Sequence, residues 1–387
     1  MNGSIPERIR RIQDPVVPIV AAHIQANPGT ISLGQGVVHY PPPQAVRTAL
    51  ETFYEQPAAH LYTPDWGYLP LVEALERKLA SENGIDMERK RVVVTAGANM
   101  AFLNAVLAIA DPGDEIVLLA PYYFNHEMAI QLASCVPVIV STTGALTPDL
   151  EAIERAITPR TRAVVTVSPN NPTGVAYSRE ELVAVNRLCR DRGIYHVSDE
   201  AYEYFVYEDT EHYSPASAPE SSAHTIALYS FSKSYGFASW RVGYMVVPEP
   251  LFESVMKIQD TNVICAPAVS QHAALACLEV GASYARGHLE ELAEVRGLAL
   301  EALGTLGDLV TIPSANGAFY VYLEVMRPLD PFDVVKRLIA EQKVAVIPGS
   351  AFGSGERCYL RVSYGALRPT QVQEGIGRLV EGLSRLR

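Results

Sequence analysis

The sequence is poor in cysteine and has no long apolar run. Only five of its 387 residues are cysteines, and no two form a CxxC pair. This usage favours reduced, buried thiols in a cytosolic protein over a disulfide framework. No segment approaches the roughly 18 consecutive apolar residues that span a bilayer, and the first residues lack the apolar stretch of a signal peptide. We therefore expect a soluble, cytoplasmic protein without a membrane partner.

Positive charge is also in deficit. The formal net charge is −12, which argues against nucleic acid or an anionic membrane surface as the main partner. A small anionic ligand stays compatible with this charge, because a local cluster of arginines can oppose the overall sign. The scattered cysteines suggest no metal-binding pattern, and we expect no metal site.

Length and patterning predict an α/β protein with two domains. From residue 91 onward, short runs rich in Val and Ile alternate with helical segments of the length that parallel strands need for a crossover. This predicts a large, doubly wound, mostly parallel sheet domain over residues 46–279. The strand that begins near Trp240 is a candidate for an antiparallel neighbour.

The rest of the chain predicts a smaller α+β domain. After residue 280 we expect a long charged helix over 283–306, strands near 310–323, a helix over 331–341 and a final helix. Residues 1–45 are rich in proline and are expected to be irregular. Because they cannot form a core of their own, we expect them to pack with residues 280–387.

Polar and aromatic residues follow several predicted strands of the large sheet, at the edge where open α/β sheets bind ligands. Gly97-Ala98-Asn99 opens a helix whose free N–H groups suit a phosphate, although such turns also serve tight packing alone. Tyr123 offers an aromatic face for a flat heterocycle or simply belongs to the core. Asp199 either caps a helix or faces a protonated ring nitrogen. Tyr202 is then placed to donate to a ring oxygen.

A lysine turn, Ser230 to Gly243, completes this set. Lys233 follows an apolar strand and lies among serines, where an amine can form a Schiff base with a carbonyl. Ser230 and Arg241 are placed to hold a phosphate. Arg361, inside an apolar strand of the second part, needs an anionic partner, either a substrate carboxylate or an internal carboxylate. Together these groups supply the contacts that pyridoxal phosphate requires.

With these motifs the chain resembles the fold-type I pyridoxal-phosphate-dependent aminotransferases of class I/II, from about Leu33 to Gly365. The resemblance implies a shared active site in a homodimer, with Lys233, Asp199 and Tyr202 as catalytic residues. It implies that the following residues bind the cofactor: Gly97, Ala98, Asn99, Tyr123, Asn171 of the NPTG stretch, Asp199, Tyr202, Ser230, Lys233, Arg241 and, across the dimer interface, Tyr62. It implies substrate binding by Gly36, Val37, Asn171 and Arg361, the last through the α-carboxylate.

Departures from the family pattern bear on the substrate. Branches that act on aspartate add a cation for the distal carboxylate, and here that position is occupied by Asn99, while residues 260–270 also lack a cation. An unpaired carboxylate is costly to desolvate. The GQGVVHYPPP stretch, with His39 and Tyr40, is similar to the branch that acts on aromatic amino acids and methionine, so we predict transfer of an amino group from such an L-amino acid to a 2-oxo acid. In a second, structural reading, His39 and Tyr40 only shape the loop before the three prolines.

Other readings stay open at this point. An aspartate aminotransferase, a cysteine-conjugate β-lyase and a kynurenine-type aminotransferase would use the same site. SFSK is also an S-x-x-K string like that of serine acyl-enzymes, but no K-T-G follows it. A pyridoxal-phosphate-binding regulator would need a DNA-binding domain, for which the chain has no spare segment.

Overall fold

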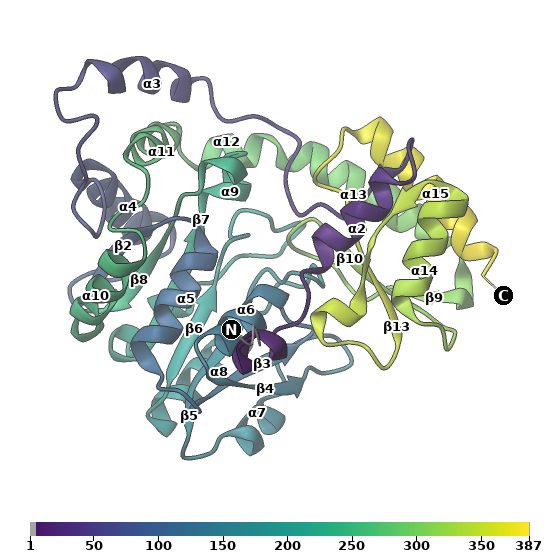
Figure 1. Cartoon of the computed structure of the whole chain (residues 1–387), viewed down its shortest axis with the longest axis horizontal. Helices are drawn as coiled ribbons and strands as arrows, with labels where there is room; N and C mark the ends of the chain where they lie inside the picture. Colours follow the sequence, from purple (N-terminus) through teal and green to yellow (C-terminus); the bar gives the residue numbers. More distant parts are fainter. Residues whose placement is uncertain (1–4, 387) are drawn as a thin grey trace.

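The larger of the two main sheets has seven strands in the order β2-β8-β7-β6-β5-β3-β4 (Figure 1). The computed structural model describes residues 5–386. The strands of this sheet are β2 (Lys90–Thr95), β3 (Glu115–Ala120), β4 (Val136–Ser141), β5 (Thr161–Val167), β6 (Tyr195–Asp199), β7 (Thr225–Ser230) and β8 (Gly243–Pro248). All pairs are parallel except those of β8, which runs antiparallel to β2 and β7. The predicted parallel sheet, with its antiparallel strand, is confirmed.

Helices cover both faces of this sheet, and the alternation of side chains decides which residues meet which helices. Val93, Ile226 and Met245 point toward one face and pack with helices α5, α6 and α10. Their neighbours, such as Val94 and Ala227, point to the opposite face and pack with α4 and α11, while α7 and α8 cover the far end of that face. The continuous apolar runs of the strands follow from burial on both sides.

The helices around the large sheet belong to the part of the chain that contains its strands. They are α3 (Ala45–Glu55), α4 (Leu69–Glu82), α5 (Ala98–Ile109), α6 (Phe124–Leu132), α7 (Leu150–Ala156), α8 (Arg179–Arg192), α9 (Phe231–Ser234), α10 (Phe252–Asn262) and α11 (Ala268–Val280). Helix α8 shows why the sequence starts and stops a helix where it does. Ser178 and Glu181 form a capping box at its first turn, and Gly193 ends it in the left-handed conformation.

A polar network lies inside the large sheet, away from its ligand-binding edge. His196 is completely buried on β6. Its Nδ1 accepts from Asn186 Nδ2 at 3.0 Å, and its Nε2 donates to Thr166 Oγ1 at 2.9 Å. Because both ring nitrogens are satisfied in the neutral form, protonation would place an extra hydrogen against an amide donor. Burial, together with the nearby His224, lowers the pKa of His196 from 6.5 to about 3.

The low pKa of His196 leads us to predict that the folded protein loses stability in mild acid. The unfolded chain binds a proton at His196 near pH 6.5 and the folded chain only near pH 3. The free energy of unfolding is therefore unaffected by His196 above pH 6.5. As the pH falls from 6.5 toward 3, His196 lowers it by about 1.4 kcal/mol per pH unit. His196→Gln, which keeps one acceptor and one donor but does not titrate, should show a shallower decline. Urea unfolding between pH 7 and pH 4 measures both slopes, and equal slopes would contradict the assignment.

The smaller sheet has four antiparallel strands in the order β12-β13-β10-β9. Its strands are β9 (Val310–Thr311), β10 (Tyr320–Val325), β12 (Ile347–Pro348) and β13 (Cys358–Ser363), and its helices are α12 (Ala282–Gly287), α13 (Leu289–Gly304), α14 (Pro331–Arg337), a π-helical turn (Leu338–Gln342) and α15 (Pro369–Ser384). Apart from α12, which lies next to α9 and α11, these elements form the right-hand part of Figure 1. Their core is shared with residues near the ligand-binding edge of the large sheet.

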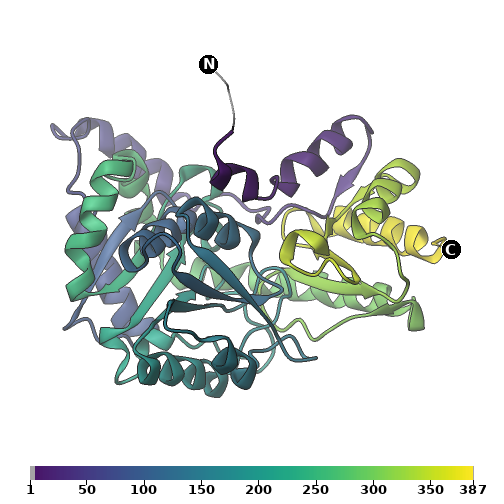
Figure 2. The same cartoon turned by 60° about the horizontal axis from the view of Figure 1, so that its bottom comes forward.

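The N-terminal segment was expected to be irregular; residues 33–44 are irregular, but for much of residues 5–32 the expectation is wrong. Helices α1 (Glu7–Arg11) and α2 (Val16–Gln25) precede a short strand, β1 (Ile31–Ser32), which pairs with β11 (Val344–Ala345). The prolines of α2 lie at its N-cap and in its first turn, where the missing N–H costs no hydrogen bond. Figure 2 shows the two helices running along one edge of the molecule, α1 near the large sheet and α2 near the small one.

The predicted long helix over 283–306 is also corrected. It is two helices, α12 and α13, that meet at His288. Gly287, a poor helix former, precedes the break, and the His288 ring stacks on Tyr40 with centroids 3.8 Å apart. The junction of the two helices therefore contacts a residue far away in the chain.

The proposed domain division stays a prediction. Every strand of the seven-stranded sheet falls inside residues 46–279, and the four-stranded sheet falls inside 280–387. Residues 1–4 and 387 of the predicted smaller domain lie outside the described part. Within residues 5–386, no helix combines the length and the apolar character that a bilayer crossing requires.

Candidate active site

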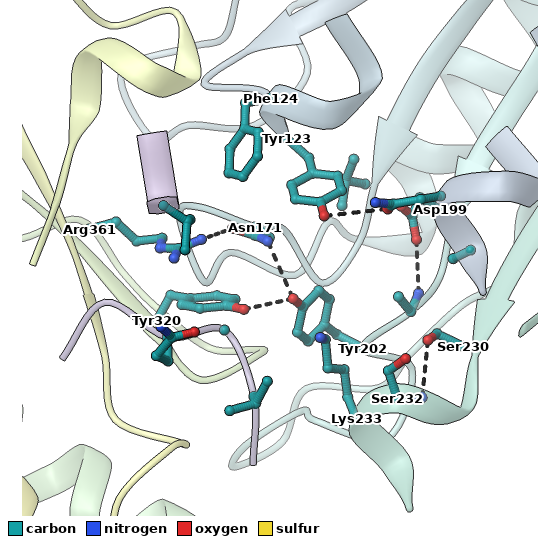
Figure 3. A pocket seen from close by; sticks show the side chains of 18 of the residues that line it. Tyr123, Phe124, Asn171, Asp199, Tyr202, Ser230, Ser232, Lys233, Tyr320 and Arg361 are labelled. Carbon is teal, nitrogen blue, oxygen red and sulfur yellow. Dashed lines mark hydrogen bonds between the residues drawn. The ribbon is translucent and has the colours of Figure 1, made fainter. Parts of the chain in front are cut away.

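One cavity lies at the carboxyl ends of the large-sheet strands, facing the small sheet. Its empty volume is about 880 Å³, including space open to solvent. Twelve of the predicted site residues line it: Gly36, Val37, Ala98, Asn99, Tyr123, Asn171, Asp199, Tyr202, Ser230, Lys233, Arg241 and Arg361. Figure 3 shows their side chains converging from both sheets. Residues that are more than 300 positions apart in the chain thus meet in one space.

Lys233 lies in the short helix α9, directly after β7. Ser230 begins this helix, and its Oγ accepts a hydrogen bond from Ser232 N at 3.1 Å. The backbone oxygen of Lys233 accepts from the Tyr40 hydroxyl at 3.0 Å, so the turn is fixed from the N-terminal segment as well. Burial, with Arg241 and Arg361 nearby, lowers the pKa of Lys233 from 10.5 to about 8. A sizeable fraction of this amine is therefore unprotonated at neutral pH and able to act as a nucleophile or base.

Arg241 and the start of helix α5 form a corner with positive potential. Gly97 adopts φ +87°, and a Cβ atom there would lie 2.3 Å from Arg241 Nη2. Arg241 itself has φ 54°, an uncommon conformation for a residue with a side chain. The N–H of Gly97 donates to Thr95 O, and Gly97 does not line the cavity. The N–H groups that remain for an anion are those of Ala98 and Asn99, in the first turn of α5.

Asp199 ends strand β6 and is buried. One carboxylate oxygen accepts from Ala201 N at 3.1 Å, and the other lies 3.1 Å from His126 Nε2. Tyr123 lies at the mouth of the same space, and its hydroxyl donates to Asn99 Oδ1 at 3.3 Å. A carboxylate held by two partners in this way keeps one orientation toward the cavity.

A chain of hydrogen bonds joins the two sheets across the cavity (Figure 3). Arg361 Nη1 donates to Asn171 Oδ1 at 2.8 Å, and Asn171 Nδ2 donates to the Tyr202 hydroxyl at 3.3 Å. Arg361 Nη2 donates to Gly34 O at 2.7 Å. The guanidinium lies between the rings of Tyr320 and Phe352. Its Nε is buried and has no hydrogen-bond partner among the described residues, which is the arrangement expected of a group that waits for an anion.

Two polar residues that contact predicted site residues were missed from the sequence. The Tyr320 hydroxyl lies 2.7 Å from the Tyr202 hydroxyl, and His126 contacts Asp199. Tyr320 starts a strand of the small sheet, and His126 lies inside α6, three residues after Tyr123. The only available signal was a polar side chain in each case at a position that the pattern predicts to be buried.

Other predicted residues lie elsewhere. Tyr62 is 78% exposed and borders a separate surface hollow with Phe53 and His272. His39 pairs with Glu291 at 2.9 Å, and Tyr40 stacks on His288. Neither His39 nor Tyr40 lines the cavity. They hold the loop that carries Gly36 and Val37, as a structural reading of the stretch also allowed.

Comparison with known proteins agrees with this geometry. Residues 28–379 match the family described as "Aminotransferase class I and II". The chain belongs to this family. Its enzymes depend on pyridoxal phosphate, so the predicted aminotransferase and its fold are confirmed, and the serine acyl-enzyme reading is wrong.

Relatives of this aminotransferase carry both aromatic and aspartate names. It is 34% identical to the aromatic aminotransferase ISS1 of Arabidopsis thaliana, over 99% of this chain and 97% of the relative. It is 32% identical to an aspartate aminotransferase of Streptomyces avermitilis, over 92% and 89%. The solved structure of a double mutant of Thermus thermophilus aspartate aminotransferase superimposes with a TM-score of 0.90 at 31% identity, covering 98% and 99%. The names alone therefore leave the substrate open.

The cavity of this aminotransferase fits pyridoxal phosphate. It contains one lysine whose pKa is lowered, a carboxylate, a phenol, and an arginine beside a helix N-terminus. The glycine at that helix start is required because a side chain would occupy the position of the Arg241 guanidinium. These are the functional groups that an aldehyde, a pyridine nitrogen, a ring oxygen and a phosphate would each need.

Proposed function

We propose that this aminotransferase acts on aromatic L-amino acids or methionine and passes their amino group to a 2-oxo acid. Among the described residues that line the cavity, the cations are Lys233, Arg241 and Arg361. Each has a proposed partner: the cofactor aldehyde, the cofactor phosphate and the substrate α-carboxylate. The absence of a fourth cation from this lining is the observation that carries the proposal, because the distal carboxylate of aspartate would be left unpaired there.

The cofactor would be held by groups from four strand ends. Lys233 Nζ would bind its aldehyde carbon, Asp199 would face the ring nitrogen, and Tyr202 and Asn171 the ring oxygen. Ser230, Arg241 and the Ala98 and Asn99 N–H groups would hold the phosphate, and the Tyr123 ring would lie against the ring face. When bound, pyridoxal phosphate supplies an electron sink for charge at the substrate α-carbon.

In this proposal Lys233 transfers the proton and Arg361 binds the substrate α-carboxylate. Arg361 fixes the α-carboxylate, which orients the α-hydrogen toward Lys233. Once the substrate amine had displaced it from the cofactor, the free Lys233 Nζ would take that proton and would return it on the cofactor side. Its lowered pKa, about 8, keeps the base form populated at the pH where the reaction runs.

The side-chain end of the cavity supports an apolar or aromatic substrate. Val17, Val37 and Phe124 line it, together with the neutral polar groups of Gln35 and Asn99. The transfer of an aromatic ring from water to such a surface is favourable. A carboxylate has no counterion there.

Single-turnover spectroscopy tests the substrate. We expect tryptophan, phenylalanine, tyrosine or methionine to convert the absorbance of the lysine-bound cofactor into that of pyridoxamine phosphate. Aspartate should react at least about 100-fold more slowly, because its second carboxylate must be desolvated without a partner. Rapid conversion by aspartate alone would overturn the proposed substrate and leave the fold and reaction class intact.

Asn99→Lys is the matched variant for this test. Asn99 is exposed to the cavity, and a lysine there supplies the missing cation. The aspartate rate should rise about tenfold or more, the effect of roughly 1.4 kcal/mol, while the rate with phenylalanine should not rise. If the variant leaves the aspartate rate unchanged, the missing cation is not the reason for the preference.

We also infer a homodimer in the cytoplasm. Two large apolar side chains that line the hollow beside α3, Leu61 and Tyr62, are exposed. Such a patch favours a protein partner, and a second copy would cover it while bringing Tyr62 toward the neighbouring phosphate site. All five cysteines are unpaired and buried, as expected of a reduced compartment.

A further inference from the structure

Tyr320 is completely buried and makes two contacts with the active site. Its hydroxyl lies 2.7 Å from the Tyr202 hydroxyl. Its ring lies under the Arg361 guanidinium, with the guanidinium carbon 4.7 Å from the ring centroid. It therefore contacts both the phenol assigned to the cofactor ring oxygen and the arginine assigned to the substrate carboxylate (Figure 3).

The hydrogen-bonding capacity of Tyr202 indicates which phenol donates. A hydroxyl has one proton to donate and two lone pairs to accept. Asn171 Nδ2 already donates to the Tyr202 hydroxyl at 3.3 Å. If Tyr320 also donates, both lone pairs are used and the proton of Tyr202 is left for the cavity. If Tyr202 donates instead, it has no proton left for a ligand.

The Tyr320 hydroxyl lies close to the backbone of Gly36. A Cβ atom on Gly36 would lie 2.6 Å from the Tyr320 hydroxyl oxygen. Gly36 therefore leaves room for this hydroxyl next to Tyr202, besides lining the cavity. A phenylalanine at position 320 would fit the same space and lose only the oxygen.

We propose that Tyr320 is a positioning residue whose hydroxyl donates to Tyr202 and so makes Tyr202 a stronger donor to the ring oxygen of pyridoxal phosphate. Hydrogen bonds in series polarise one another. A stronger bond to that oxygen withdraws negative charge that would otherwise hold the proton on Lys233 Nζ in the cofactor-bound enzyme. Tyr320 thus lowers the pKa of Lys233 Nζ through Tyr202. This inference rests on the proposed placement of the ring oxygen and does not depend on the substrate.

Tyr320→Phe tests this in the cofactor-bound enzyme. The pKa of Lys233 Nζ can be read from the pH dependence of the cofactor absorbance, without any turnover. We expect it to rise by about 0.5 units or more, which corresponds to part of one neutral hydrogen bond. The KM for phenylalanine should change less than about twofold, because the ring under Arg361 is kept.

Two further variants separate this effect from a loss of packing. Tyr207→Phe removes a buried hydroxyl that donates to Ala318 O over the same distance, 2.7 Å, outside the cavity lining. It should lower the melting temperature as Tyr320→Phe does but leave the absorbance pKa unchanged. In a Tyr202→Phe background, Tyr320→Phe should no longer shift that pKa, because its route through Tyr202 is gone.

The outcomes are distinct. An unchanged absorbance pKa in Tyr320→Phe, or an equal shift in Tyr207→Phe, would overturn the proposal. A fall in the pKa would also overturn it, because it would mean that Tyr202 donates to Tyr320. A shift that persists in the Tyr202→Phe background would show that Tyr320 does not act through Tyr202. An enzyme that prefers aspartate would overturn the proposed substrate and still show the Tyr320 shift.

Discussion

Replacement of Lys233 by alanine is expected to lower the rate of amino-group transfer by at least about 10⁴-fold, because the variant loses both its covalent link to the cofactor and its proton carrier. Lys233 is the only lysine among the described residues that line the cavity. The variant should still bind pyridoxal phosphate without a covalent bond, because Ser230, Arg241 and Asp199 are unchanged.

Two measurements and a control variant check this expectation. Borohydride reduction followed by mass spectrometry should add the cofactor mass to the wild-type protein and not to Lys233→Ala. Gel filtration with excess cofactor should show that the variant retains it. Lys257→Ala, which removes an exposed lysine of α10, is the matched control and should behave as the wild type. Near-normal transamination by Lys233→Ala would show that Lys233 is neither the lysine that binds the cofactor nor the proton carrier.

Four of the predicted site residues share one physical feature. Asp199 and Ser230 end strands β6 and β7, and Asn171 and Lys233 follow β5 and β7 within a few residues. Local patterns of Val and Ile define these strands, and parallel strands bring their carboxyl ends to one edge. The sequence therefore predicted which residues meet without any knowledge of long-range packing.

The residues that it missed depend on contacts between distant segments. Tyr320 meets Tyr202 only because the small sheet docks against the large one, and the buried phenol has no local mark that separates it from a core tyrosine such as Tyr322. The contact of His288 with Tyr40, at the junction of α12 and α13, likewise joins distant segments. The roles of His39 and Tyr40 were uncertain for the same reason, since only the structure shows that they hold the loop from outside the cavity.

Loss of Arg361 is the second change expected to have a large effect. In Arg361→Leu, kcat/KM for an amino acid should fall about 30-fold to several thousand-fold, the consequence of removing one partner of a buried charge pair, about 2–5 kcal/mol. Arg361 is 2% exposed, and two of its nitrogens already have protein partners. Its position is therefore fixed before the substrate arrives, which limits the entropy lost on binding.

A substrate analogue isolates the contact between Arg361 and the α-carboxylate. Tryptamine is tryptophan without the α-carboxylate, so it cannot use Arg361. Wild-type enzyme should prefer tryptophan to tryptamine strongly in the single-turnover assay, and Arg361→Leu should lose most of that preference by slowing only the tryptophan reaction. Any general damage to the fold would slow both substrates together.

Arg361→Lys completes the comparison. A lysine keeps the charge but cannot donate at once to Asn171, to Gly34 and to a carboxylate in the planar geometry of a guanidinium. It should recover part of the tryptophan rate and remain well below the wild type. Equal losses for tryptophan and tryptamine in both variants would mean that Arg361 supports the hydrogen-bond chain through Asn171 to Tyr202 and does not bind the substrate carboxylate.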